Sequence, residues 1–121
     1  MEVTFFAQED NPGTHNEEPW NLHAVWDSGM IDHTGLQYDK YIHKLETKLQ
    51  SGGKLGELQR GTPLDWALEA HQAAIDHWYG KSRGLDLGEE YYQESLPVVD
   101  DMLTKAGVRL AKLLTDALKP R

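Results

Sequence analysis

Two side chains in the N-terminal third of the chain have the types and the spacing to bind a metal ion. His23 and Asp27 stand four residues apart within the run Trp20–Gly29. On a helix this spacing places an imidazole and a carboxylate on one face, one turn apart. Helical zinc sites use donors at this spacing, but a surface ion pair worth about 0.3–0.5 kcal/mol uses it too. Because two ligands do not complete a zinc site, the spacing alone leaves both interpretations open.

The other histidines show no second ligand at a zinc-like spacing. His71 falls on the apolar face of an expected helix, in register with leucine, alanine and tryptophan side chains, and is predicted to be a core histidine. The rest are expected in loops, at a helix edge or on a polar face: His15, His33, His43 and His77.

Charged residues further along the chain are interpreted as structural. Asp65 and Glu69 lie one turn apart, which is compatible with an acid pair but more typical of a solvated helix face. Arg109 lies in a long apolar helix. We expect it to pair with Asp86 or Glu90, or to extend its head group to solvent.

Three aromatic residues could contact a ligand or pack in the core. Trp26 precedes Asp27 directly and is interpreted as a core aromatic. Tyr91 and Tyr92 could stack on a nucleic-acid base, although adjacent tyrosines at a helix start are more typical of packing.

The composition is that of one folded domain. The chain has 121 residues, of which 39% are hydrophobic and 26% charged. It contains no cysteine, which excludes disulfides and cysteine-based zinc sites. The net charge of −8 argues against a basic nucleic-acid groove, but not against a nuclease whose metal ions supply the positive charge. The sequence has no apolar run of about 20 residues, and its start lacks the features of a signal peptide.

The patterning predicts a mostly α fold, a helical bundle of four to five helices with one short N-terminal strand. The strand is expected at 2–7, followed by a flexible loop at 8–19. Since no second convincing strand follows, its partner is expected from an upstream segment or from another chain. Helices are expected at about 21–34, 36–50, 62–79 and 89–118.

Several residues predict where these elements begin, end or break. Thr62 is expected to cap a helix, with Pro63 in its first turn and Asp65 at the third position. A loop is expected at 84–88. Pro97 is expected to kink the last helix or restart it after a short helix at 89–94. Gly107 lowers the helix propensity of this segment, and a close crossing with another helix would explain why a glycine stands there.

Four segments together resemble the single-strand-specific, three-zinc nucleases, which share a fold with zinc-dependent phospholipase C. The most specific segment is Asn21-Leu22-His23-x-Val25-Trp26-Asp27. The strand Val3–Phe6, Trp66-Ala67-x-Glu69 and Ala106-Gly107-Val108-Arg109-Leu110-Ala111 agree in order and spacing. Ala70 replaces a serine that is usual in the family. The resemblance covers essentially all 121 residues.

The resemblance implies that His23 and Asp27 are ligands of one zinc ion and that Ser28 and Gly29 border the substrate pocket. In the family, that ion's third protein ligand comes from an upstream His-Gln-Pro-Leu-His segment, which this sequence does not contain. The ligands of the other two ions are missing as well. We therefore interpret residues 1–121 as a single domain that resembles the C-terminal part of a larger nuclease domain.

The implied activity is zinc-dependent hydrolysis of phosphodiester bonds in single-stranded nucleic acid. Because most zinc ligands are missing, we expect little or no activity from the isolated chain. Two alternatives stay open: a non-catalytic helical module that forms a homo-oligomer, and one chain of a two-part enzyme with a complementary N-terminal chain. The family is usually secreted or periplasmic, whereas this sequence shows no leader, so the compartment stays open.

Overall fold

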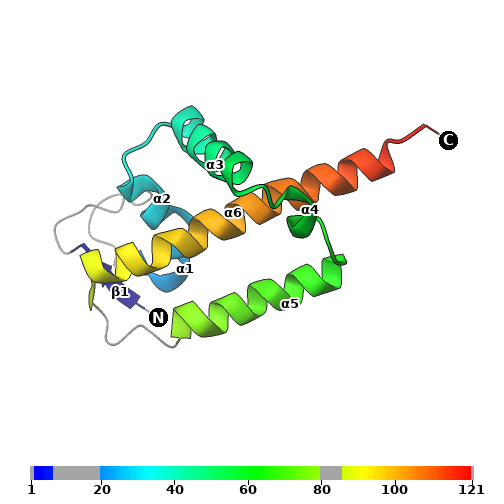
Figure 1. Ribbon diagram of the computed structural model, residues 1–121. Coiled ribbons are helices and arrows are strands. Elements are labelled where there is room, and N and C mark those ends of the chain that lie inside the picture. Colours follow the sequence, from blue (N-terminus) through cyan, green and yellow to red (C-terminus); the bar gives the residue numbers. More distant parts are fainter. Residues whose placement is uncertain (1, 7–19, 80–85, 121) are drawn as a thin grey trace.

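A long C-terminal helix, α6 (Glu89–Ala117), runs through the centre of the molecule and positions most other elements (Figure 1). In this computed structural model the described residues are 2–6, 20–79 and 86–120. Helix α3 (Tyr38–Gly52) lies on one side of α6 and α5 (Pro63–Ala74) on the other. The mostly α fold with a short N-terminal strand is confirmed, whereas the expected loop at 8–19 lies outside the described residues.

The N-terminal strand has partners within the chain. Strand β1 (Glu2–Phe5) lies between β2 (Trp20–Asn21), which is antiparallel to it, and β3 (Asp86–Leu87), which is parallel. The expectation of a partner from elsewhere was therefore wrong. Both partners are two residues long, too short to show the alternation by which a strand is recognised. Strand β3 also occupies part of the expected loop at 84–88, of which 84 and 85 lie outside the described residues.

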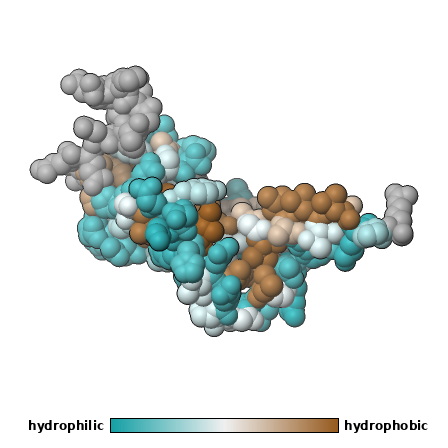
Figure 2. Space-filling view, turned by 90° about the horizontal axis from the view of Figure 1, so that it is seen from above, coloured by the Kyte–Doolittle hydropathy of each residue, from teal (hydrophilic) through white to brown (hydrophobic). Residues whose placement is uncertain are grey.

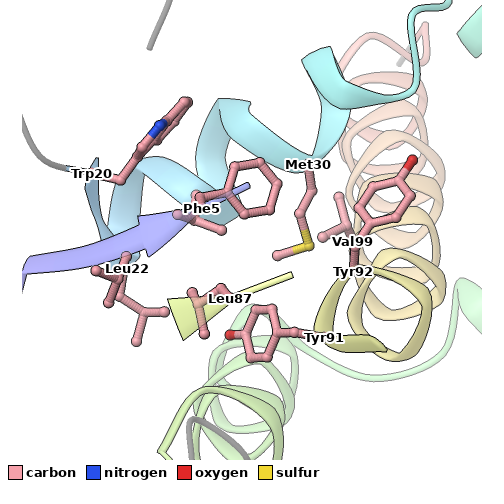
Figure 3. Packing of buried hydrophobic residues seen from close by; sticks show 10 residues of the cluster. Phe5, Trp20, Leu22, Met30, Leu87, Tyr91, Tyr92 and Val99 are labelled. Atoms are coloured by element: carbon pink, nitrogen blue, oxygen red, sulfur yellow. The ribbon is translucent and has the colours of Figure 1, made fainter. Parts of the chain in front are cut away.

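The hydrophobic core lies where this sheet meets the first helical segment and the start of α6 (Figure 3). Its most deeply buried side chains are Phe5, Val25, Met30 and Leu87. The tyrosines at the start of α6 project into the same cluster. The core therefore fixes the segment that carries the predicted metal ligands against α6.

The first helical segment is continuous but not uniform. It consists of α1 (Leu22–Ala24), the π-helical turn η1 (Val25–Gly29) and α2 (Met30–His33). Asn21 caps its start: the Asn21 side chain accepts a hydrogen bond from the backbone N–H of Ala24 at 2.8 Å.

Helix α3 ends at Gly53, whose φ of 62° is the left-handed conformation that glycine adopts readily. A short helix, α4 (Leu55–Leu58), follows. The predicted capping box before α5 is confirmed, since Thr62 and Asp65 exchange hydrogen bonds between side chain and backbone. Helix α5 then continues into the π-helical turn η2 (Ile75–Tyr79).

A buried hydrogen-bond network joins α3 to α6. The hydroxyl of Tyr41 donates to the carboxylate of Asp100, which is 5% exposed, and Lys44 Nζ lies 3.1 Å from the other carboxylate oxygen. Burial and the hydrogen bond to Asp100 raise the pKa of Tyr41 well above its ordinary value, so the hydroxyl stays a donor.

Helix α6 differs from the sequence expectations at two points. It continues through Pro97 instead of restarting there, and residues on both sides of the proline, including Ser95 and Val99, are buried. A proline removes one N–H, and this loss is tolerated when packing fixes the neighbouring turns. At Gly107 an added Cβ would meet no atom within 4 Å, so no close crossing explains the glycine.

Much apolar surface remains exposed on α5 and α6. None of the residues of α5 is buried, and apolar side chains gather along the arm that leads to the C-terminus (Figure 2). The exposed large apolar residues on the two helices are Leu64, Leu68, Leu103, Leu110, Leu113 and Leu114. Among the described residues, no helix has the length and apolar character needed to cross a bilayer.

Candidate metal centre

His23 and Asp27 are both exposed residues of the first helical segment. His23 is in α1 and Asp27 in the π-helical turn η1, and both side chains are solvent-exposed. Leu22, Val25 and Met30 of the same segment are buried in the core. The core therefore leaves both side chains accessible to solvent, and their role as metal ligands stays a prediction.

The turn that carries Asp27 is wider than an α-helical turn. The N–H of Met30 donates to the carbonyl of Val25, five residues earlier, which is the π-helical pattern. An α-helix was expected through Asp27, and at this turn the expectation was wrong. A wider turn changes the angle, seen along the helix axis, between the side-chain directions of positions 23 and 27. Single π-turns within α-helices are rare and are frequent at functional sites.

The two residues predicted to border the substrate pocket differ in exposure. Ser28 is exposed, and its hydroxyl donates to the carbonyl of Ala24 at 3.2 Å. Gly29 is buried against the core: a Cβ there would lie 2.9 Å from Trp20 Cζ3 and 3.3 Å from Phe5 Cε1. The glycine is needed for this packing, and a role in substrate binding stays a prediction for both residues.

Trp26 connects the π-turn to α6. Its indole Nε1–H donates to the hydroxyl of Tyr91 at 2.8 Å, and the two rings meet edge to face with centroids 6.4 Å apart. Tyr91 and Tyr92 are both buried, as the packing interpretation predicts. Burial raises the pKa of Tyr91, so its hydroxyl stays protonated at neutral pH.

The donors present suit zinc in kind but not in number. An exposed imidazole and carboxylate on one helix are ligands that zinc accepts, and zinc sites use three or four protein ligands. Within residues 2–6, 20–79 and 86–120, no group of three or more His, Cys, Asp or Glu side chains is placed to hold a metal ion. The described residues therefore do not form a complete zinc site.

The other histidines are spread over the structure. His71 is exposed, so the prediction of a core histidine was wrong, because α5 has no buried face. His33 stacks on Phe6 with ring centroids 3.9 Å apart. His77 lines an open cavity of about 500 Å³ between α5 and α6. His43 is exposed, and His15 lies outside the described residues.

Glu69 and Arg109 form an ion pair that the sequence analysis did not foresee. Arg109 was expected to pair with Asp86 or Glu90 or to extend to solvent, but its side chain is 12% exposed and pairs with Glu69. Glu69 was expected on a solvated face, and its side chain is 36% exposed. Lys105 binds the same Glu69 carboxylate and also Asp101. The hydrogen bond from Lys105, followed by that from Arg109, lowers the pKa of Glu69. Burial alone would lower the pKa of Lys105, but its hydrogen bonds to the two acids outweigh burial and raise it.

Arg109 makes two further contacts. Its guanidinium carbon lies 5.3 Å from the centroid of the Trp66 ring, and its Nε donates to the carbonyl of Leu58 at 3.2 Å. Trp66 Nε1 in turn donates to the carbonyl of Arg60. Arg109 therefore ties α4 and α5 to α6, which is a structural role.

Comparison with known proteins decides the family. Residues 9–119 match a family model described as S1/P1 Nuclease. The chain belongs to the S1/P1 nuclease family. Endonuclease 3 of Arabidopsis thaliana is 32% identical over 114 residues, which cover 83% of this chain and 38% of that protein. Nuclease S1 of Aspergillus oryzae is 28% identical over 121 residues, which cover 84% of this chain and 42% of that protein. The chain thus spans about two fifths of the length of these curated relatives.

Within this S1/P1 nuclease chain, the motif segments fall into two spatial groups. Val3–Phe6 and Asn21–Asp27 meet at the sheet and present the predicted ligands, whereas Trp66–Glu69 and Ala106–Ala111 meet at the Arg109 contacts. Sequence reasoning missed Tyr91 as a partner of Trp26. No spacing rule links residues 65 positions apart, and the only available signal was an aromatic pair at a helix start.

Proposed function

We propose that this chain supplies two zinc ligands, His23 and Asp27, to a nuclease centre that hydrolyses phosphodiester bonds of single-stranded nucleic acid. The observation that carries the proposal is the exposure of both side chains on a helical segment whose Leu22, Val25 and Met30 are buried in the core. Membership of the S1/P1 nuclease family supports it, because relatives carry the names nuclease and endonuclease.

The residues of the proposed centre have separate roles. The imidazole of His23 and the carboxylate of Asp27 hold the ion, and Ser28 and Gly29 border the substrate pocket. Zinc, when bound, activates water and stabilises charge that develops on the phosphate. The remaining ligands come from the part of the family domain that has no counterpart in this sequence. For this reason we propose that the isolated chain has little or no hydrolytic activity.

Zinc titration of purified 1–121 tests the ligand assignment. We expect weak binding by calorimetry, which His23→Ala and Asp27→Asn each abolish. Asp32→Asn is the matched control, since Asp32 is also an exposed acid on the same helical segment. Zinc binding that survives both ligand substitutions, or the absence of any zinc binding, would contradict the assignment.

An activity assay tests the proposal that the isolated chain has little or no hydrolytic activity. Purified 1–121 with zinc is expected to leave single-stranded DNA intact over hours. Robust zinc-dependent cleavage that His23→Ala removes would overturn the proposed inactivity while supporting the ligand role.

The exposed apolar side chains of α5 and α6 favour a second feature, association with another chain. Large exposed apolar patches are typical of interaction surfaces. We propose that these helices contact either a second copy of this chain or a complementary N-terminal chain that carries the remaining ligands. Light scattering separates the cases: a concentration-dependent mass supports self-association, and a monomer at high concentration contradicts it. An adjacent reading frame encoding the histidine-rich part would support a two-part enzyme.

A further inference from the structure

We infer that Tyr91 is a positioning residue for the candidate metal centre, because through Trp26 it holds the π-turn that carries Asp27. This inference rests on the proposed function. Tyr91 itself contacts neither predicted ligand in any described hydrogen bond; it acts on the turn between them.

The hydrogen bond between Trp26 and Tyr91 starts within the π-turn that it is proposed to hold. Trp26 is the residue before Asp27 and lies within η1, the turn closed by the hydrogen bond from Met30 to Val25. Its indole donates to Tyr91 at 2.8 Å across 65 residues of sequence. The direction of the Trp26 side chain and the backbone at Asp27 are therefore coupled.

Tyr91 is itself firmly placed. It is buried in the core near Leu87, as Figure 3 shows, and its hydroxyl also interacts with the side chain of Ser95, which is 5% exposed. Both residues lie in the first two turns of α6, where packing leaves little freedom. The Tyr91 hydroxyl therefore has a fixed position and can hold the π-turn in place through Trp26.

The hydrogen bond has a specific cost if it is removed. A half-buried indole N–H without an acceptor loses a hydrogen bond worth about 0.5–1.5 kcal/mol. An α-helical turn competes with the π-turn, because π-turns are intrinsically rare. Without the Tyr91 hydroxyl, the turn gains freedom to readjust, and this contact no longer holds the backbone that carries Asp27.

Tyr91→Phe tests this, with Tyr41→Phe as the matched control. Both substitutions delete one buried hydroxyl that bonds between α6 and another helix, and both keep the ring. The readouts are zinc affinity by calorimetry and the hydrogen-exchange rate of the Met30 amide relative to the amides of α6. For Tyr91→Phe we expect about fivefold weaker zinc binding and about fivefold faster exchange at Met30. For Tyr41→Phe, both should stay within about twofold of the wild type at equal folded fraction.

A double-mutant cycle with Trp26→Phe separates positioning from general stability. If Tyr91 acts through Trp26, the double variant binds zinc no more weakly than the worse single variant. Equal effects of Tyr91→Phe and Tyr41→Phe on both readouts, or no effect of Tyr91→Phe on Met30 exchange, would overturn the inference. Should the wild type bind no zinc, the proposed function fails, and the exchange rate alone still decides whether Tyr91 holds the turn.

Discussion

The carboxylate of Glu69 accepts a hydrogen bond from the guanidinium of Arg109, and this contact joins α5 to α6. Both residues lie in segments that resemble motifs of the nuclease family. Because none of the residues of α5 is buried, the position of this helix depends on polar contacts and on Trp66 more than on a hydrophobic face. These two motifs therefore maintain the fold, and the segment around His23 carries the predicted chemistry.

Arg109→Lys should destabilise the chain although the charge is kept. Lysine loses the flat contact over the Trp66 ring and the hydrogen bond from Nε to Leu58. We expect a loss of about 1–2 kcal/mol in the free energy of unfolding, measured by urea denaturation. Lys112→Arg, at an exposed pair with Asp116, is the control and should be neutral. Equal stability of Arg109→Lys and wild type would show that the stacking contributes nothing.

The ion pair of Glu69 should make stability depend on acid pH. Its pKa is lowered in the folded state, so the unfolded chain takes up the proton first as the pH falls. The stabilisation is present above the unfolded pKa of about 4.3 and is lost as the pH falls through the folded pKa. Glu69→Gln should therefore lose less stability than the wild type between about pH 5 and pH 3. Since Glu69 is partly exposed, we expect a difference of about 0.5–1 kcal/mol. Parallel pH profiles by urea denaturation would contradict this.

Local signals in the sequence predicted the helices well. The same signals could not predict contacts between residues far apart in the sequence. The capping box at Thr62 is encoded within four residues, so its prediction was confirmed. The ion pair between Glu69 and Arg109 joins residues 40 positions apart, and either side chain had nearer partners in the sequence. His71 was misplaced for a related reason: helical periodicity identifies an apolar face but not whether another element covers it.

The sequence proposes residues for the candidate site, and these stay a prediction, but it does not encode the local geometry around them. The spacing of His23 and Asp27 and the motif around them predict two metal ligands, and both residues are exposed. Within the π-turn, Gly29 packs against Phe5 of β1 and Trp20 of β2, and no helix periodicity encodes this contact. The partner strands β2 and β3 were not predicted because each has two residues and pairs with β1 through tertiary contacts.

Gly29→Ala should destabilise the core and disturb the π-turn. The added methyl group would lie 2.9 Å from Trp20 and 3.3 Å from Phe5, two rings that are themselves packed edge to face. We expect a loss of about 1–3 kcal/mol, because neither ring can move without opening the core. Gly52→Ala is the control, since a Cβ there meets no atom within 4 Å. Thermal unfolding measures both, and equal melting temperatures would refute the close packing.

Tyr41→Phe should cost stability through Asp100. The substitution keeps the ring but leaves a buried carboxylate with one donor fewer, so that Lys44 becomes its main described side-chain partner. We expect a loss of about 1–3 kcal/mol by urea denaturation. Tyr38→Phe, at a side chain that is 84% exposed, should change stability little. A stable Tyr41→Phe variant would show that solvent replaces the hydroxyl at Asp100.

Gly107 allows folding to be separated from association. In isolation, Gly107→Ala should raise the free energy of unfolding by about 0.5–1 kcal/mol, because alanine favours the helix and its methyl group meets no atom within 4 Å. Gly107→Leu should likewise fold, since the space around the position is open. If another chain packs closely against the exposed Leu103 and Leu110, the leucine variant should bind it at least about tenfold more weakly, or lose the mass increase seen by light scattering. Gly56→Leu, on α4 in equally open space, is the control. Unchanged association of Gly107→Leu would exclude this stripe of α6 from the interface and leave the exposed face of α5 as the candidate.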